Sequence, residues 1–299
     1  MDDRQLADAA IHDISRDSRP VNVMEPNGPT ARVLGVPVIE GATPQRWQGF
    51  VDDEDTCADA DRCLFMLGPA RVYVSGGSAV MINRIDLGDR LAYDFMVYSW
   101  AMEMLLTQRR RFTLHASLVT SPQGCTVAIA GDSGAGKSTT AAALVARGWT
   151  LACDDVAEID LRGELPLIVP HERPVHLSDR AIKLLGADPS IGRLLPGRTK
   201  RTVQIDADLS RRPLGLIVQL RTSPGKISTA EVSAADATAV LAAHGESSGV
   251  TQAPELRADY FGWLTKLAGA TPVVDLTRPP EDESLEEVCD ALDRLANRL

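Results

Sequence analysis

The sequence predicts an α/β fold in two parts: a small β-rich N-terminal module over residues 1–92 and an α/β domain over residues 93–299 with a phosphate-binding loop at its centre. Three observations support this prediction. Short apolar segments separated by proline and glycine fill the first part. Apolar runs of strand length alternate with segments of helical length in the second. A complete glycine-rich motif lies between an apolar strand and an alanine-rich helix at residues 126–140.

The N-terminal module begins with a proline-rich stretch, which favours short strands and loops because proline lacks the backbone N–H that a helix needs. We expect one strand over residues 33–39. After an acidic, turn-like stretch, strands are expected over residues 63–67 and 71–75, joined by a Gly-Pro turn, and another over residues 79–82.

The second part opens with a helix over residues 93–108, where apolar residues are dense enough for a mostly buried helix. Ser178 is the expected N-cap of a short helix further on. The remaining expected elements are, in chain order, strands at 113–119 and 125–130, a helix at 138–147, strands at 150–153, 156–161 and 165–169, a helix at 178–185, a strand at 214–220, helices near 233–243 and 255–268, a strand at 271–276 and a helix from about Leu285.

Composition and charge argue against several classes of protein. The formal charge of −10 gives a surface that repels nucleic-acid backbones, so we expect no nucleic-acid partner. The chain has no long apolar run and no signal-peptide pattern at its N-terminus, so we expect no membrane association and a cytoplasmic location. Five scattered cysteines indicate neither a disulfide framework nor a zinc site. A homo-oligomer is left open.

The glycine-rich segment fills every fixed position of the motif G-x-x-x-x-G-K-[S/T]. Glycines allow backbone dihedrals that turn N–H groups toward an anion, and the following helix adds its positive N-terminal end. Lys137 supplies an ammonium for the β- and γ-phosphates, and the Ser138 hydroxyl suits Mg²⁺. The residues expected around the phosphates are Gly131, Asp132, Ser133, Gly134, Ala135, Gly136, Lys137, Ser138 and Thr139. The alternative is an ordinary glycine-rich corner between a strand and a helix.

Asp154 and Asp155 follow the strand at 150–153, which begins directly after the helix of the loop. In a right-handed β-α-β unit the carboxyl ends of neighbouring parallel strands open into one crevice. Adjacent side chains point in different directions, so we expect one carboxylate to hold Mg²⁺ and the other to act as a base toward an acceptor. The alternative is that both only hold Mg²⁺. By position alone, His115 on its apolar strand is a hydrogen-bonded core residue.

Four segments, at residues 115–119, 130–138, 142–148 and 153–159, resemble the catalytic domain of HPr kinase/phosphorylase. They match the family's histidine before the loop, its G-D-S-G-x-G-K-S loop, its L-x-x-R-G helix end and its D-D-x-x-E-I segment. The resemblance implies a core akin to that of ATP-dependent phosphoenolpyruvate carboxykinase, with ATP and Mg²⁺ as its cofactors.

Carried over to this chain, the resemblance implies a role for each matching side chain. It places Lys137 on the phosphates and Ser138 with Asp155 on Mg²⁺. It makes Asp154 the base toward an acceptor hydroxyl and His115 the neighbour that tunes this aspartate.

Downstream, the chain departs from the bifunctional members of that family. Where they carry E-[I/V]-R-G-x-G, residues 169–176 read Val-Pro-His-Glu-Arg-Pro-Val-His, which is more similar to the HPr-kinase-related proteins of lasso-peptide clusters. Those proteins phosphorylate a serine of a precursor peptide, so the resemblance implies a kinase with a hydroxyl acceptor. Glu172, Arg173, Lys200 and Arg201 are candidate substrate-binding residues, or exposed surface residues.

Two other functions fit the loop. One is a small-molecule kinase on the same fold, with a polar metabolite as its acceptor. The other is a nucleotide-dependent switch or ATPase that has no acceptor.

Overall fold

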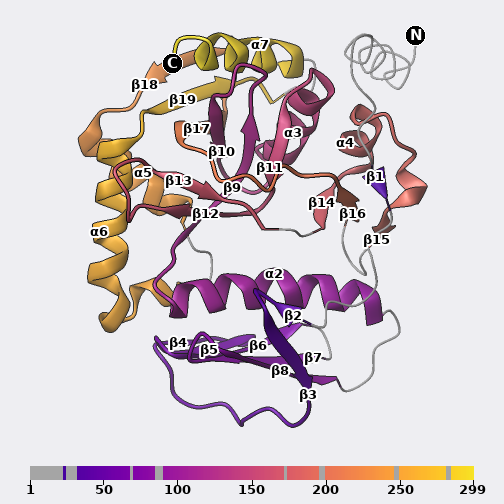
Figure 1. Ribbon diagram of the computed structural model, residues 1–299, viewed down its shortest axis with the longest axis vertical. Helices are drawn as coiled ribbons and strands as arrows, with labels where there is room; N and C mark the ends of the chain where they lie inside the picture. The colour runs from indigo at the N-terminus through magenta and orange to yellow at the C-terminus, as the bar shows by residue number, and fades with distance from the viewer. Residues whose placement is uncertain are drawn as a thin grey trace.

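The computed structural model describes residues 23–24, 32–67, 70–84, 90–171, 174–194, 199–245, 249–280 and 284–299. These residues form a mixed α/β structure with three sheets. Figure 1 shows the N-terminal sheet below, helix α2 (Arg90–Gln108) across it, and the larger sheet with its helices above.

The N-terminal sheet has the strand order β2-β3-β8-β7-β6-β5-β4. The strands predicted at 63–67, 71–75 and 79–82 are confirmed. The bounds are β2 (Arg32–Val33), β3 (Val36–Glu40), β4 (Val51–Asp52), β5 (Thr56–Ala58), β6 (Arg62–Leu67), β7 (Ala70–Ser75) and β8 (Ala79–Arg84).

The single strand predicted over residues 33–39 is wrong. The chain reverses at Leu34 and Gly35, whose φ angles are 49° and 80°, so β2 and β3 pair as an antiparallel hairpin. Two central residues with positive φ make the tight turn whose twist suits a hairpin, and alternation of apolar residues alone does not reveal such a turn.

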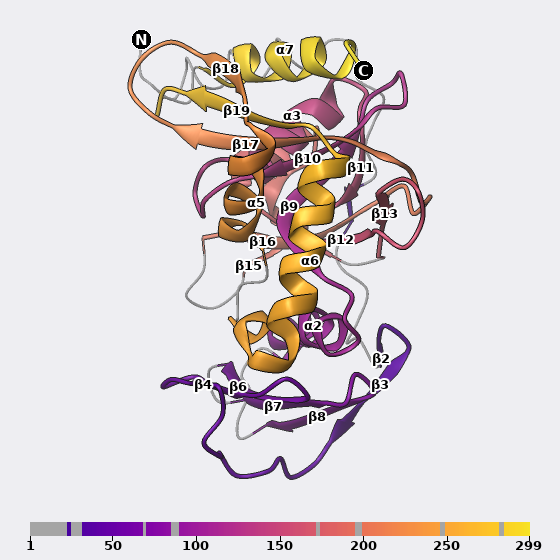
Figure 2. The same ribbon diagram turned by 90° about the vertical axis from the view of Figure 1, so that its left-hand side faces the viewer.

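Helix α2 covers one face of the N-terminal sheet. Its residues Met102 and Leu105 are fully buried in a cluster with Val72 and Val80 of the sheet. Figure 2 shows the helix as a layer between this sheet and the rest of the chain, and Leu256 of the larger part joins the same cluster. Helix α2 spans residue 92 and packs against residues of both parts of the chain. The domain boundary at residue 92 therefore stays a prediction.

The larger sheet has the order β13-β12-β9-β10-β17-β19-β18, with β11 also pairing with β9. Strands β10, β17 and β19 are parallel to one another. The bounds are β9 (Thr113–Thr120), β10 (Thr126–Ala130), β11 (Thr150–Cys153), β12 (Val156–Asp160), β13 (Leu167–Val169), β17 (Leu214–Thr222), β18 (Ser228–Glu231) and β19 (Val273–Arg278).

Helices cover both faces of this sheet. Along β10, Val127 and Ile129 face one core cluster while Ala128 and Ala130 face another, as the two-residue period of a strand requires. The first cluster lies under α3 (Lys137–Ala146), α4 (Asp179–Leu184) and α7 (Leu285–Ala296), and the second under α5 (Ala234–Ala243) and α6 (Pro254–Ala270). These helices confirm the predicted ones.

One expectation about this sheet is wrong. The strand at 150–153 is not a parallel neighbour of the loop strand, because β9 lies between β10 and β11 and is antiparallel to both. The short turn between β9 and β10 makes them a hairpin, which leaves only the other edge of β9 for β11. Since β10 and β11 still run in the same direction, their carboxyl ends reach the same edge of the sheet.

A third, small sheet lies beside α4. It contains β1 (Val23–Met24), β14 (Val175–Leu177), β15 (Arg193–Leu194) and β16 (Arg201–Ile205), and none of these strands was predicted. Ser178 accepts a hydrogen bond from the N–H of Ala181 at 3.1 Å, which confirms it as the N-cap of α4. Two 3-10 turns complete the described elements, η1 (Pro189–Ile191) and η2 (Val250–Gln252).

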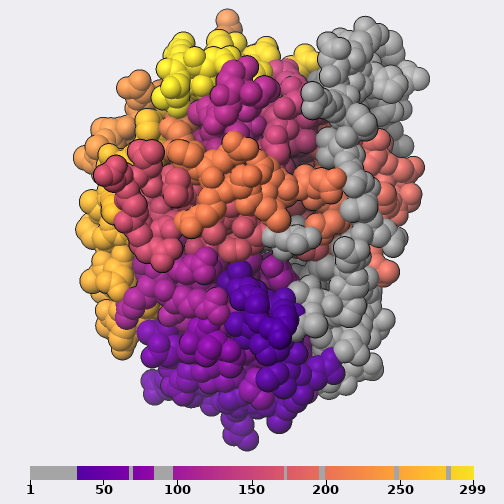
Figure 3. Space-filling model, in the orientation of Figure 1, coloured from indigo at the N-terminus to yellow at the C-terminus, as the bar shows by residue number. Residues whose placement is uncertain are grey.

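The connection from β16 to β17, residues 206–213, crosses the face shown in Figure 3, where it is orange above the indigo N-terminal module. The Asp208 N–H donates to the Leu151 carbonyl, and the Ile168 N–H donates to that of Arg212. This connection therefore ties β11 and β13 together from outside. Among the described residues, no helix is long and apolar enough to cross a membrane.

Candidate functional site

The glycine-rich loop follows β10 and turns on three glycines with positive φ: Gly131 at 149°, Gly134 at 86° and Gly136 at 100°. At Gly131 a Cβ atom would lie 2.5 Å from the carbonyl oxygen of Leu220 on β17, so no other residue fits there without moving the strand. Helix α3 begins directly after the loop, at Lys137. The strand, loop and helix therefore adopt the arrangement that the motif predicts.

The Lys137 side chain folds back over the loop. Its Nζ atom donates to the carbonyl of Gly131 at 2.7 Å and to that of Asp132 at 3.2 Å. Burial lowers the pKa of Lys137, the charges of Asp154 and Asp155 oppose this effect, and the charge of Lys200 adds to it. The two predicted aspartates and Lys200 thus lie within electrostatic reach of the loop lysine.

The two aspartates occupy a break between β11 and β12, and they differ in exposure and in partners. Asp154 is 3% exposed and accepts hydrogen bonds from Ser117 Oγ at 2.5 Å and from Ser138 Oγ at 3.2 Å. The Asp155 side chain is 37% exposed, and its Oδ1 lies 3.0 Å from Nδ1 of His115. One carboxylate therefore faces the loop helix, and the other is open to solvent beside a histidine.

These partners are the reverse of those that the family resemblance implied, which paired Ser138 with Asp155 and His115 with Asp154. Asp155 has a left-handed φ of 83°, and this turn separates the directions of the two side chains. Val156 then pairs with His115 on β9, which brings Asp155 beside that histidine.

The residues around the loop fit a nucleoside triphosphate with Mg²⁺. Ser138 and Asp154 offer hard oxygen ligands, and Mg²⁺ in proteins is usually held by one or two carboxylates together with phosphate oxygens. Within the described ranges, no group of three or more His, Cys, Asp or Glu side chains could hold a metal by protein ligands alone. The donor set thus suits an ion that arrives with phosphates.

Two arginines that the sequence analysis did not single out lie beside the loop. Arg278, the last residue of β19, donates to the Ala135 carbonyl at 3.0 Å, and Arg180 of α4 lines a cavity of about 220 Å³ with it. Ligands bind at the carboxyl ends of parallel strands, so the position of Arg278 after the predicted strand at 271–276 was the signal that could have identified it.

The candidate substrate residues have different outcomes. Glu172 and Arg173 lie outside the described residues. Lys200 is exposed and lies within electrostatic reach of Lys137. Arg201 donates to Asp179 at 2.7 Å and to the Gly192 carbonyl at 3.1 Å, so its side chain holds α4 against the end of η1.

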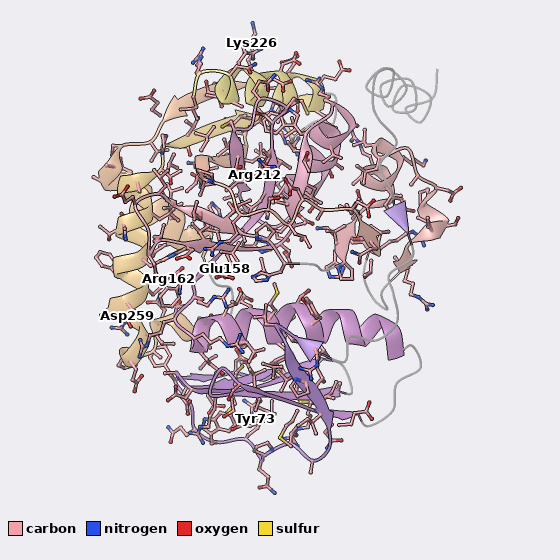
Figure 4. The ribbon with its side chains drawn as sticks, in the orientation of Figure 1. Tyr73, Glu158, Arg162, Arg212, Lys226 and Asp259 are labelled. Atoms are coloured by element: carbon pink, nitrogen blue, oxygen red, sulfur yellow. The ribbon has the colours of Figure 1, made fainter. Side chains whose placement is uncertain are left out.

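Glu158 occupies the third acidic position of the aspartate segment and is 2% exposed. It lies between the larger sheet and α2 (Figure 4), where Arg111 donates to both of its oxygens at 2.6 and 2.7 Å and His171 Nε2 lies 2.6 Å away. Burial alone would raise the pKa of Glu158, but the hydrogen bonds from His171 and Arg111 outweigh it and hold the pKa below the ordinary value. The carboxylate therefore joins three separate segments near the site.

Comparison with known proteins finds a likeness among solved structures. No family model and no curated protein matches the chain. Among solved structures, the chain is similar to the Hpr(Ser) kinase/phosphatase from Coxiella burnetii, with 16% identity over 62% of this chain and 91% of that chain and a TM-score of 0.33. Because the TM-score is this low, the proposals below rest on the residues of this chain.

Proposed function

We propose that this chain is an ATP- and Mg²⁺-dependent kinase that transfers the γ-phosphate to a hydroxyl group, and that its acceptor is a serine of a ribosomal precursor peptide. The observation that carries the proposal is that two neighbouring carboxylates differ in their partners and in their exposure. Asp154 lies with Ser138 at the loop helix, and Asp155 lies with His115 in a more exposed position.

On the donor side, the loop N–H groups and Lys137 bind the phosphates, and Ser138 and Asp154 hold Mg²⁺. When bound, the ion neutralises charge on the β- and γ-phosphate oxygens. Ser117 keeps Asp154 in place through its 2.5 Å hydrogen bond. This assigns Asp154 the metal role that the family resemblance gave to Asp155.

On the acceptor side, Asp155 takes the proton of the acceptor hydroxyl while the hydroxyl oxygen attacks the γ-phosphorus. The bond from the γ-phosphorus to its bridging oxygen breaks, and ADP leaves. His115 Nδ1 lies 3.0 Å from Oδ1 of Asp155 and so fixes the carboxylate. Both side chains are more than a third exposed, which leaves room for a peptide to approach.

What supports a peptide acceptor is the resemblance of the loop and aspartate segments to HPr kinase/phosphorylase, together with the departure at residues 169–176, which is more similar to the related proteins of lasso-peptide clusters. The loop alone does not separate this acceptor from a metabolite.

Mass spectrometry of a serine-containing precursor peptide after incubation with the protein, ATP and Mg²⁺ tests the proposal. We expect a gain of one phosphoryl group. Asp155→Asn should slow transfer by about 10²- to 10⁴-fold, the range for a lost general base, and leave ATP affinity nearly unchanged. Asp154→Asn should instead weaken the Mg²⁺ dependence of ATP binding.

Glu231→Gln, on the exposed edge strand β18, is the matched control and should behave as wild type. Release of phosphate from ATP without phosphorylation of any hydroxyl acceptor would instead support a nucleotide-dependent switch or ATPase. If the Asp155→Asn variant keeps wild-type turnover, Asp155 is not the base.

A further inference from the structure

A buried histidine lies beside the proposed reaction site. His244 is the C-cap residue of α5 and is 5% exposed. Its carbonyl accepts a hydrogen bond from the N–H of His115 at 2.8 Å. Nothing in the sequence marks this position, because it follows the predicted helix at 233–243 like any loop residue.

The register of the sheet explains why this contact matters. On β9, Ala116 pairs with Ala130, the last residue of β10. One step further, β10 would have to supply Gly131 as the partner of His115, but there the chain leaves the sheet to form the loop. The His244 carbonyl takes that place on β9.

The ring of His244 reaches the other neighbour of β10. Its Nε2 lies 2.9 Å from Nε2 of Gln219, the residue of β17 that pairs with Ala130. His244 thus joins β9 through its main chain and β17 through its ring, at the end of β10. Within the described residues, the Gln219 Oε1 atom is buried without a hydrogen-bond partner, so the ring is the contact that holds this amide.

The surroundings keep the ring neutral at neutral pH. Burial lowers the pKa of His244, and the cationic groups that face it act in the same direction against the single opposing carboxylate. The charged and titratable groups facing it are Asp132 of the loop, Lys137 of α3, His115 of β9 and Arg221 of β17. A neutral ring hydrogen-bonds to an amide without adding positive charge beside the loop lysine.

We infer that His244, held by Gln219, is a positioning residue for phosphoryl transfer: it fixes His115, and through His115 the carboxylate of Asp155, relative to the phosphate-binding loop. The inference rests on the proposed function. Without the ring contact, His115 loses the link through His244 to β17 beyond the end of β10, and the pair of His115 and Asp155 moves away from the loop. Misplacement of reacting groups by about 1 Å costs about 10²-fold in rate.

Three substitutions separate this role from simple space filling. His244→Phe keeps most of the volume and removes both ring nitrogens, and His244→Ala removes the ring. His244→Gln places an amide within reach of Gln219. We expect the Phe and Ala variants to lose about 10²-fold in kcat with little change in the KM for ATP, and the Gln variant to recover most of that loss.

Gln219→Leu should reproduce the loss, and the double variant Gln219→Leu with His244→Phe should be no slower than either single one, because both break the same contact. In an Asp155→Asn background His244→Phe should cost little further rate, since it acts through that carboxylate. Thermal unfolding and ATP binding of each variant show that it is folded.

Wild-type kcat in a folded His244→Phe variant would overturn the inference and leave the proposed kinase standing. So would a rise in the KM for ATP at unchanged kcat, which would place the histidine on the donor side. If the wild-type protein transfers phosphate to no hydroxyl acceptor, the proposed function fails and the inference fails with it.

Discussion

The donor and acceptor sides of the candidate site are built in different ways. Apart from Asp154, the proposed donor side is one uninterrupted segment, residues 131–139, in which three glycines set the path of the backbone and Lys137 folds onto its own loop. The acceptor side joins His115 from β9, Asp155 from the break after β11 and His244 from the end of α5. Local geometry therefore determines the first side, and contacts between distant segments determine the second.

The largest effect on ATP binding is expected on the donor side. Lys137→Met removes the ammonium that the loop carbonyls hold, so we expect ATP binding to be lost and transfer to fall by about 10³-fold, as for loss of one strong donor at a developing charge. ATP binding by calorimetry and transfer by mass spectrometry measure the two effects. Lys226→Met, in the exposed turn between β17 and β18 (Figure 4), is the control.

If the Lys137→Met variant keeps its affinity for ATP, the loop binds phosphate without its lysine. That result would contradict the comparison between a donor side set by local geometry and an acceptor side set by distant contacts.

The next largest effect is expected on the stability of the segments beside the acceptor side. Glu158→Gln removes the buried charge that Arg111 and His171 contact, and loss of one member of such a pair costs about 3 kcal/mol of unfolding free energy. Chemical denaturation measures this loss. Glu164→Gln, exposed in the turn between β12 and β13, should change stability little.

The pKa of Glu158 gives the same prediction a pH dependence. Since the folded pKa lies below the ordinary value of 4.5, the carboxylate stabilises the fold above pH 4.5, and this contribution is lost as the pH falls through the lower, folded value. The gap in stability between wild type and Glu158→Gln should therefore narrow below pH 4.5. A gap that stays constant from neutral to strongly acid pH would contradict the ion-pair account.

The smallest expected effect tests the backbone of the loop. Gly131→Ala places a methyl group against the Leu220 carbonyl and should cost about 2 kcal/mol of stability. Gly124→Ala, in the turn between β9 and β10, also has a positive φ but meets no atom within 4 Å, so it should cost about 1 kcal/mol. Equal losses for the two variants would mean that the contact with β17 is unimportant.

Much of the fold was predictable because its signals are local. Apolar runs and helical periodicity located the strands and helices of the larger sheet, and Ser178 was identified as a cap from its residue type and position. The predictions failed where a turn interrupts a pattern, as at Leu34 and Gly35, and where strands are very short, as in β14 and β15. The first depends on two backbone dihedrals, and the second on pairing with β16 further along the chain.

The candidate site divides in the same way. The sequence by itself determined the loop, because glycine at 131, 134 and 136 and lysine at 137 specify a backbone path and a charge within one turn of chain. It also determined that two adjacent carboxylates follow the next strand.

Only the tertiary structure decided which carboxylate has which partner. The left-handed turn at Asp155 and the antiparallel pairing of β12 with β9 place this residue beside His115 and leave Asp154 beside Ser138. The tertiary structure also places His244 where β10 ends and the loop begins. The physical reason is that side-chain direction at a strand break depends on one backbone dihedral and on the register of a distant strand, and spacing along the chain specifies neither.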